Sequence, residues 1–297
     1  MQRRQRQAQR RRQRRWRWGL SGGFLLTALL LIGGITAQRP KLTPTTSDPL
    51  RAVENLFIGP RVHYGLQTAW RTQLAGRSER VSIALYSAQT GQLYSRTNAA
   101  HHQFHMASTV KVAILAGILR QEKGHLTAQE KALATRMIEN SDNAATNLLF
   151  EDYLGGQAGL QATFAAFGMT HSTAHKAWGL STTTPADQVR LLNQIYFSSD
   201  QLNDQARDYL RYLMTHVATD QQWGISAGSD SFALKNGWLP YGKDQWIINS
   251  IGYIDGPGAN DYTIAIYTDH NPSMASGKQL VEQLAQVTRQ AMRRLDD

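Results

Sequence analysis

The sequence predicts an α+β domain: an antiparallel five-stranded sheet flanked by N- and C-terminal helices, beside an all-helical lobe. Strand-like alternation of apolar residues occurs in two groups, within 81–96 and within 232–267, and a long helical region separates them. Helical patterns also open and close the globular part. Two separated strand groups can share one antiparallel sheet, and the helices between them then form a second lobe with a cleft at the junction.

The first elements are a helix and two strands. The helical pattern covers 50–75 and is interrupted near Gly59-Pro60, and the strands are expected at 81–86 and 92–96. Prolines and glycines interrupt helices because proline lacks an N–H and clashes with the preceding turn.

The helical region begins with a segment that is apolar on most sides, 108–120, which we expect to be buried. Thr127 with Glu130 forms a capping-box pattern that opens a helix to about residue 140. Pro185 after Thr184 marks another helix start, because proline fits the first helical position. The remaining periodic segments are helices at 143–152, 157–167, 185–198 and 201–217, strands at 232–235, 246–253 and 262–267, and a last amphipathic helix at 278–295.

The formal net charge of +10 is concentrated at the N-terminus. Nine arginines occur within 1–17 without any acidic residue, and the rest of the chain has 23 basic and 22 acidic residues. The nearly neutral remainder offers no phosphate-binding field, so we expect no nucleic-acid partner. Residues 18–38 carry no charge over 21 positions, which as a helix would span about 31 Å, enough for a bilayer.

These features predict a single-pass protein of the cell membrane. Its parts would be a basic cytoplasmic segment at 1–17, a transmembrane signal-anchor at 18–38, a Pro- and Thr-rich linker at 39–49 and a globular domain at 50–297 on the extracytoplasmic side. A cleaved signal peptide is the alternative, although 35–37 fits a cleavage site poorly. The absence of cysteine excludes disulfides and thiol catalysis. We expect a monomer.

Three short motifs occur in order: S-T-V-K at 108–111, S-D-N at 141–143 and K-N-G at 235–237. Ser108 and Lys111 lie three residues apart on one helix face, so a neutral, desolvated lysine can accept the serine proton. Each motif alone also has an ordinary explanation, namely a surface Ser/Lys pair, a helix N-cap and an Asn-Gly hairpin turn.

The set S-x-x-K, S-D-N and K-T-G is the signature of class A β-lactamases and penicillin-binding proteins. The sequence resembles this superfamily, most closely its class A β-lactamase-like branch, over roughly 75–297. The resemblance implies the DD-peptidase/β-lactamase-like fold. It also implies that Ser108 is the nucleophile, Lys111 its base and Ser141 the relay of a proton to the leaving group, while Asn143 holds the substrate amide and the lysine.

The resemblance places substrate binding at Lys235, Asn236, Gly237 and Trp238. The family has a threonine or serine hydroxyl where Asn236 stands. We expect Lys235 to attract a substrate carboxylate and the Asn236 amide to donate a hydrogen bond in place of that hydroxyl. The backbone N–H groups of Ser108 and Trp238 would form the oxyanion hole.

One departure from class A concerns the residue that activates water. The family carries a Glu-x-x-Leu-Asn loop before a Thr-Thr-Thr-Pro helix start. Residues 182–185 supply that start here, but no Glu or Asp lies between Asp152 and Asp187, and the loop is short. General-base catalysis is worth about 10²–10⁴ in rate, so we expect slow deacylation. His171 and His175 are the alternative bases.

The resemblance therefore predicts an extracytoplasmic serine acyl-enzyme hydrolase that opens β-lactam rings, as in β-lactam catabolism and antibiotic resistance. The alternatives are a cell-wall D-Ala-D-Ala peptidase, acting on a D-Ala-terminated peptide, and a non-turnover β-lactam or peptidoglycan sensor.

The stretch between Ser108 and Ser141 is short for class A, which implies a reduced helical lobe and an open cleft. We expect no cofactor.

A cluster of three histidines, H-H-x-x-H, directly precedes the proposed nucleophile. It consists of His101, His102 and His105. Zinc sites use such residues, but the sequence offers no obvious further ligand, so we expect no metal site.

Overall fold

The computed structural model describes residues 49–243, 245–256 and 260–293, with side chains described from residue 58 onward. The basic segment 1–17, the proposed anchor 18–38 and the linker up to residue 48 lie outside the described residues. Within the described part of the chain, no helix combines the length and the apolar character needed to cross a membrane.

The sheet has five antiparallel strands in the order β2-β1-β7-β6-β5, which confirms the predicted fold class. β7 pairs with β1 and so joins the two strand groups that the helical region separates in the sequence; Ile83 lies opposite Ile266. The strands are β1 (Arg80–Ser87), β2 (Gln92–Thr97), β5 (Phe232–Pro240), β6 (Trp246–Ile254) and β7 (Tyr262–Asn271).

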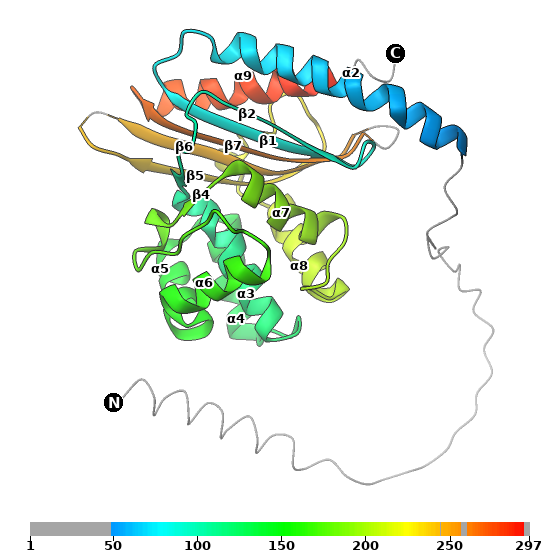
Figure 1. Ribbon diagram of the computed structural model, residues 1–297. Helices are drawn as coiled ribbons and strands as arrows, with labels where there is room; N and C mark the ends of the chain where they lie inside the picture. Colours follow the sequence, from blue (N-terminus) through cyan, green and yellow to red (C-terminus); the bar gives the residue numbers. More distant parts are fainter. Residues whose placement is uncertain (1–48, 244, 257–259, 294–297) are drawn as a thin grey trace, which may run out of the picture. The chain divides into compact units, whose positions relative to one another are not determined.

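Two long helices, α2 (Pro49–Leu74) and α9 (Met274–Arg293), cover one face of the sheet (Figure 1). They pack on each other as well as on the strands. The buried Trp70 indole donates to Thr288 Oγ1 at 2.8 Å, linking the first described helix to the last.

Helix α2 continues through Gly59-Pro60, so the predicted interruption is wrong. Its later part presents Val62, Leu66 and Trp70 at intervals of four residues, and all three are buried in the core beneath the helix. A proline inside a helix costs about 3 kcal/mol. Burying three large apolar side chains, at roughly 1.5–3 kcal/mol each, exceeds that cost.

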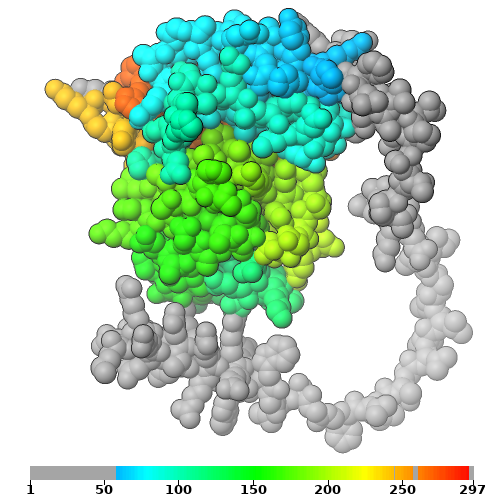
Figure 2. Space-filling view, in the orientation of Figure 1, coloured from blue at the N-terminus to red at the C-terminus, as the bar shows by residue number. Residues whose placement is uncertain are grey.

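The helical lobe lies against the opposite face of the sheet (Figures 1 and 2). α3 is its central helix, and every residue from Val110 to Leu119 is buried, as its apolar sequence predicts. The lobe consists of α3 (Val110–Gln121), α4 (Ala128–Glu139), α5 (Asn143–Leu148), α6 (Gly156–Ala166), α7 (Pro185–Tyr196) and α8 (Asp204–Thr215).

Both predicted helix starts are confirmed. Thr127 and Glu130 exchange the two hydrogen bonds of a capping box at α4. The Thr184 hydroxyl accepts from the Asp187 N–H, and Pro185 follows it as the first residue of α7.

Two features differ from the predicted elements. The helix expected at 143–152 changes to a π-helical segment, Leu149–Leu154, which ends at a left-handed glycine. A small second sheet pairs β3 (Phe104–His105) with β4 (Thr182–Thr183) and so joins the chain before Ser108 to the start of α7.

Candidate active site

Ser108 lies in a 3-10 turn, Ala107–Thr109, between β3 and the start of α3. Ala107 has φ 48°, in the left-handed region that residues with a Cβ rarely adopt. Such strain persists only where surrounding contacts hold it. The serine is half-buried and opens onto a cleft.

The contacts that hold this turn come mainly from the sheet. Thr109 Oγ1 donates to the Met106 carbonyl at 2.7 Å and lies 2.6 Å from the buried Tyr267 hydroxyl. The Asn249 amide donates to the His105 carbonyl at 2.9 Å. Sequence reasoning did not find Asn249 or Tyr267, because nothing local marks a strand residue that supports a turn far away in the sequence.

Lys111 brings the first two motifs together. Its Nζ donates to the Ser141 carbonyl at 2.6 Å, to Ser141 Oγ at 3.0 Å and to Asn143 Oδ1 at 2.9 Å. Ser141 has φ 55°, another left-handed residue at this site. All three hydrogen bonds of Nζ go to the second motif and none to Ser108, so proton transfer from Ser108 requires the amine to turn.

Burial lowers the pKa of Lys111 to about 7, and the nearby Asp142 carboxylate partly opposes that change. The neutral and charged forms are therefore both populated near neutral pH. A neutral amine has two N–H groups, enough for the Ser141 carbonyl and the Asn143 amide oxygen. Its lone pair is then left for the Ser141 hydroxyl at 3.0 Å, and the amine must turn towards Ser108 to act as the general base for that serine.

Asp142 supports the site indirectly, by capping the helix that follows Ser141. One carboxylate oxygen accepts from the Ala145 N–H at 2.9 Å and caps α5, and the other accepts from Arg136 Nε at 2.8 Å. These hydrogen bonds lower the pKa of Asp142, so the group stays ionised. The cap fixes the bend that places Ser141 and Asn143 on either side of it.

The third motif lies within β5, so 235–237 does not form a hairpin turn. Lys235 is completely buried, and Nζ donates to the Asn236 carbonyl at 3.3 Å. Burial lowers the pKa of Lys235 well below its usual value, and the Lys111 amine lowers it further. Lys235 therefore attracts a carboxylate less strongly than a fully charged lysine would.

Asn236 has a different role from the one the sequence suggests. Its amide donates to the Gln221 carbonyl at 2.8 Å and to the Trp223 carbonyl at 3.0 Å. Both amide hydrogens are thus used within the protein, and in this structure none is available for a substrate. The side chain anchors the loop before β5 instead.

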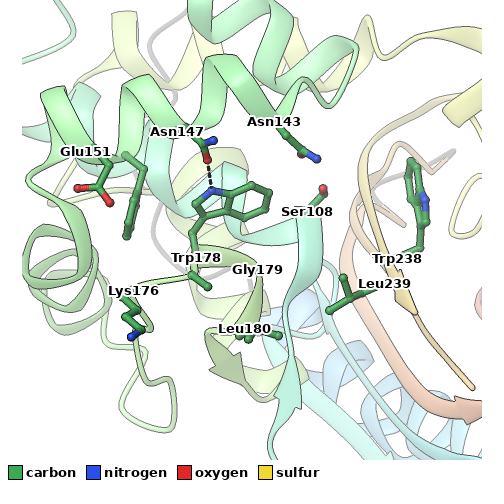
Figure 3. A pocket seen from close by; sticks show the side chains of 12 residues that line it. Ser108, Asn143, Asn147, Glu151, Lys176, Trp178, Gly179, Leu180, Trp238 and Leu239 are labelled. Carbon is green, nitrogen blue, oxygen red and sulfur yellow. Dashed lines mark hydrogen bonds between the residues drawn. The ribbon is translucent and has the colours of Figure 1, made fainter. Parts of the chain in front are cut away.

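A cleft of about 620 Å³ opens over Ser108 (Figure 3). Trp178 lies on one side of the serine and Trp238 on the other, with Asn143 above it in this view. The described residues that line the cleft are Ser108, Asn143, Asn147, Phe150, Glu151, Lys176, Ala177, Trp178, Gly179, Leu180, Trp238 and Leu239. The walls are mainly apolar, which suits a substrate with a sizeable apolar part.

His171 and His175, the two alternative bases for deacylation, are not among the described residues that line this cleft. His175 interacts through Nδ1 with the backbone of Ala177, and the exposed His171 approaches Asp187 at 3.9 Å. Asp187 itself is buried and accepts from the His171 N–H and Ser172 Oγ, so it anchors the loop rather than facing Ser108.

Two of the three histidines before Ser108 contact separate partners. His102 Nε2 lies 2.8 Å from Asp269 Oδ2, and His105 Nδ1 lies 3.0 Å from the Leu180 carbonyl. Over the described ranges of the chain, no three potential metal ligands lie close enough to hold an ion.

A comparison with protein families identifies a family for this chain. The model described as "Beta-lactamase enzyme family" matches residues 125–292, more than half of the chain. The chain belongs to the beta-lactamase enzyme family. The matched region contains the motifs at 141–143 and 235–237, whereas Ser108 and Lys111 precede it. Family and fold together make the protein a serine hydrolase of β-lactamase-like type.

Several solved structures share the fold. A beta lactamase from Xanthomonas campestris is 22% identical with a TM-score of 0.65, over 77% of this chain and 98% of its own. A class A beta-lactamase representative from Bacteroides cellulosilyticus is 16% identical with a TM-score of 0.68, over 78% and 99%. PBP-A is 21% identical with a TM-score of 0.66, over 78% and 96%. No curated protein sequence matches the chain.

Proposed function

We propose that this beta-lactamase family member forms an acyl-enzyme between Ser108 and β-lactams outside the cytoplasm, and that it hydrolyses the acyl-enzyme slowly. The observation that carries the proposal is the buried Lys111, held between Ser141 and Asn143 beneath a cleft that exposes Ser108. A buried amine with a pKa near 7 beside a serine nucleophile suits acyl transfer at neutral pH.

In the proposed reaction, Ser108 Oγ attacks the lactam carbonyl carbon and its proton passes to Lys111 Nζ. The carbon–nitrogen bond of the ring then breaks, and the proton reaches the leaving nitrogen through the Ser141 hydroxyl, which lies 3.0 Å from the amine. The product is an ester on Ser108, and one water molecule is consumed when it is hydrolysed.

Backbone N–H groups of Ser108 and Trp238 would stabilise the oxyanion. β5 is an edge strand, and alternate N–H groups on its outer side have no strand partner.

Slow hydrolysis follows from the residues near the ester. The segment between Asp152 and Asp187 holds no carboxylate. His171 approaches Asp187, and His175 Nδ1 is engaged by the Ala177 backbone; neither histidine is among the described residues that line the cleft. Without a positioned base, deacylation loses the factor of about 10²–10⁴ that general-base catalysis supplies.

A cell-wall D-Ala-D-Ala peptidase is the second candidate, favoured by the same missing base and by the similarity of the fold to PBP-A. Such an enzyme would use the same acyl-enzyme chemistry on a peptide. For the location, the support is the sequence of 1–38, where nine arginines precede an uncharged run of 21 residues.

The test is a time course of the purified full chain with a chromogenic cephalosporin, followed by absorbance and by intact-protein mass. The proposal expects a stoichiometric burst and a lasting adduct on Ser108, and no adduct with Ser108→Ala. Rapid steady turnover without an adduct would contradict slow deacylation. Labelling that persists in Ser108→Ala would place the nucleophile elsewhere. D-Ala-D-Ala peptides offered as substrates in the same assay distinguish the second candidate.

A further inference from the structure

We propose that Trp178 screens the acyl ester on Ser108 from water and thereby sets the lifetime of the acyl-enzyme. This inference rests on the proposed acylation of Ser108 and assigns a residue to the slow step. The indole would act by its bulk, occupying the side of the serine from which water would otherwise reach the ester.

The ring of Trp178 lies over Lys111 and to one side of Ser108 (Figure 3). Its centroid is 5.0 Å from Lys111 Nζ, and the lysine beneath it is completely buried. The indole N–H donates to Asn147 Oδ1 at 2.8 Å, which fixes the plane of the ring in the cleft wall (Figure 3). A ring held at both its face and its edge excludes water better than a mobile side chain does.

The short 3-10 turn that carries the ring, Trp178–Leu180, is itself packed on the nucleophile turn. A Cβ on Gly179 would lie 3.8 Å from the Cα of Ala107, so the two backbones are nearly in contact. The Leu180 carbonyl also lies 3.0 Å from His105 Nδ1. The indole is therefore positioned by backbone contacts with the segment that presents Ser108.

The ring also separates Ser108 from a carboxylate. Among the described residues that line the cleft, Glu151 is the only acidic one, and it lies on the far side of Trp178 from Ser108 (Figure 3). Water near Glu151 would have to pass the indole to reach an ester on the serine. The placement of this one aromatic side chain thus withholds both water and an acid–base group from the site.

The test compares wild type, Trp178→Ala and the control Trp178→Phe as full chains. Each is loaded with a β-lactam, freed of excess reagent and followed by intact mass as the adduct decays. We expect Trp178→Ala to lose the adduct at least about tenfold faster, with the roughly 10²–10⁴ of general-base catalysis as the upper bound, because the substitution admits water and removes the ring between the ester and Glu151. Trp178→Phe, which keeps a ring, should decay within about threefold of wild type.

A second readout reports access to the ester rather than general loosening. Added hydroxylamine should accelerate decay several-fold more in Trp178→Ala than in wild type, because a small nucleophile then reaches the ester. Thermal unfolding verifies that each variant is folded, and Trp178→Leu replaces Trp178→Ala if that variant fails to fold.

The outcomes separate the two proposals. If wild type gains no adduct, the proposed function fails and this inference fails with it. If wild type is labelled but Trp178→Ala decays at the wild-type rate, only the inference fails. It also fails if Trp178→Phe decays as fast as Trp178→Ala, or if folded Trp178→Ala cannot be acylated, since the ring is assigned no role in acylation.

Discussion

Gly237 lies so close to Ser108 that no side chain fits between them. A Cβ on Gly237 would lie 2.8 Å from the backbone nitrogen of Ser108 and 2.8 Å from the Met106 carbonyl oxygen. The edge strand β5 and the nucleophile turn therefore meet backbone to backbone. Because the proposed oxyanion donors come from these two segments, this contact sets the distance between them.

Replacing Gly237 with alanine should disrupt the site more than the fold. The added methyl must push β5 and the turn apart, which typically costs about 1–3 kcal/mol of stability. Displacing one oxyanion donor costs about 10²–10³ in rate. We expect Gly237→Ala to lower the acylation rate by about 10² or more, measured by intact mass, and the free energy of unfolding by about 1–3 kcal/mol in urea.

Gly65→Ala is the matched control, because a Cβ there meets only Ala291 Cβ at 3.9 Å within helix α2. Alanine is favoured over glycine in a helix by about 1 kcal/mol, so this variant should be unchanged or more stable and fully reactive. Normal acylation by Gly237→Ala would show that the close contact is not needed for the chemistry.

The acylation rate should follow the titration of Lys111. Only the neutral amine can accept the Ser108 proton, and burial lowers the pKa of Lys111 to about 7. Raising the pH through 7 deprotonates the amine, so the rate should rise about tenfold per pH unit below 7 and level off above it. The measurement is the rate of adduct formation between pH 5 and 9.

Asp142→Asn should move this profile to lower pH. The carboxylate of Asp142 raises the pKa of Lys111, and asparagine removes the charge while still capping α5. Asp204→Asn is the control, since that carboxylate is 92% exposed on α8. A midpoint that moves upward in Asp142→Asn, or moves equally in both variants, would contradict Lys111 as the base.

Lys235→Met should stabilise the protein while impairing acylation. The amine is buried with one hydrogen bond of 3.3 Å, and methionine has a similar volume without a polar group. The folded-state pKa lies below the unfolded value, so between those values the unfolded chain binds the extra proton and wild-type stability rises with pH. The advantage of Lys235→Met should therefore be largest near pH 7, at about 1 kcal/mol or more, and should shrink towards pH 10.

Urea unfolding at pH 7 and 9.5 measures this difference, with the exposed Lys131→Met as the control that should stay within about 0.5 kcal/mol of wild type. An acylation rate equal to that of wild type would show that Lys235 takes no part at the site. If Lys235→Met is less stable than wild type, the buried amine of Lys235 stabilises the folded state, which contradicts the prediction drawn from its single 3.3 Å hydrogen bond.

Local sequence patterns predicted those helices and strands that have strong apolar periodicity or a clear capping residue. The presence of the five main strands, the buried helix that follows Ser108 and the caps at Thr127 and Thr184 were predicted correctly, although β5 continues from its predicted end at 235 to Pro240. Two of the errors have separate physical causes. The β3–β4 pair is two residues long on each side, too short for alternation to show, and α2 passes Pro60 because of apolar packing that propensity does not include.

The sequence by itself determined the chemistry available to the site: a serine and a lysine three residues apart, two further motifs in order, and no carboxylate between Asp152 and Asp187. Tertiary structure decided what those groups face. The Asn236 amide donates hydrogen bonds to the Gln221 and Trp223 carbonyls, and the Trp178 ring lies over Lys111. Such contacts join segments that lie far apart in the chain, and they depend on strand register and helix packing, which no local pattern of residues contains.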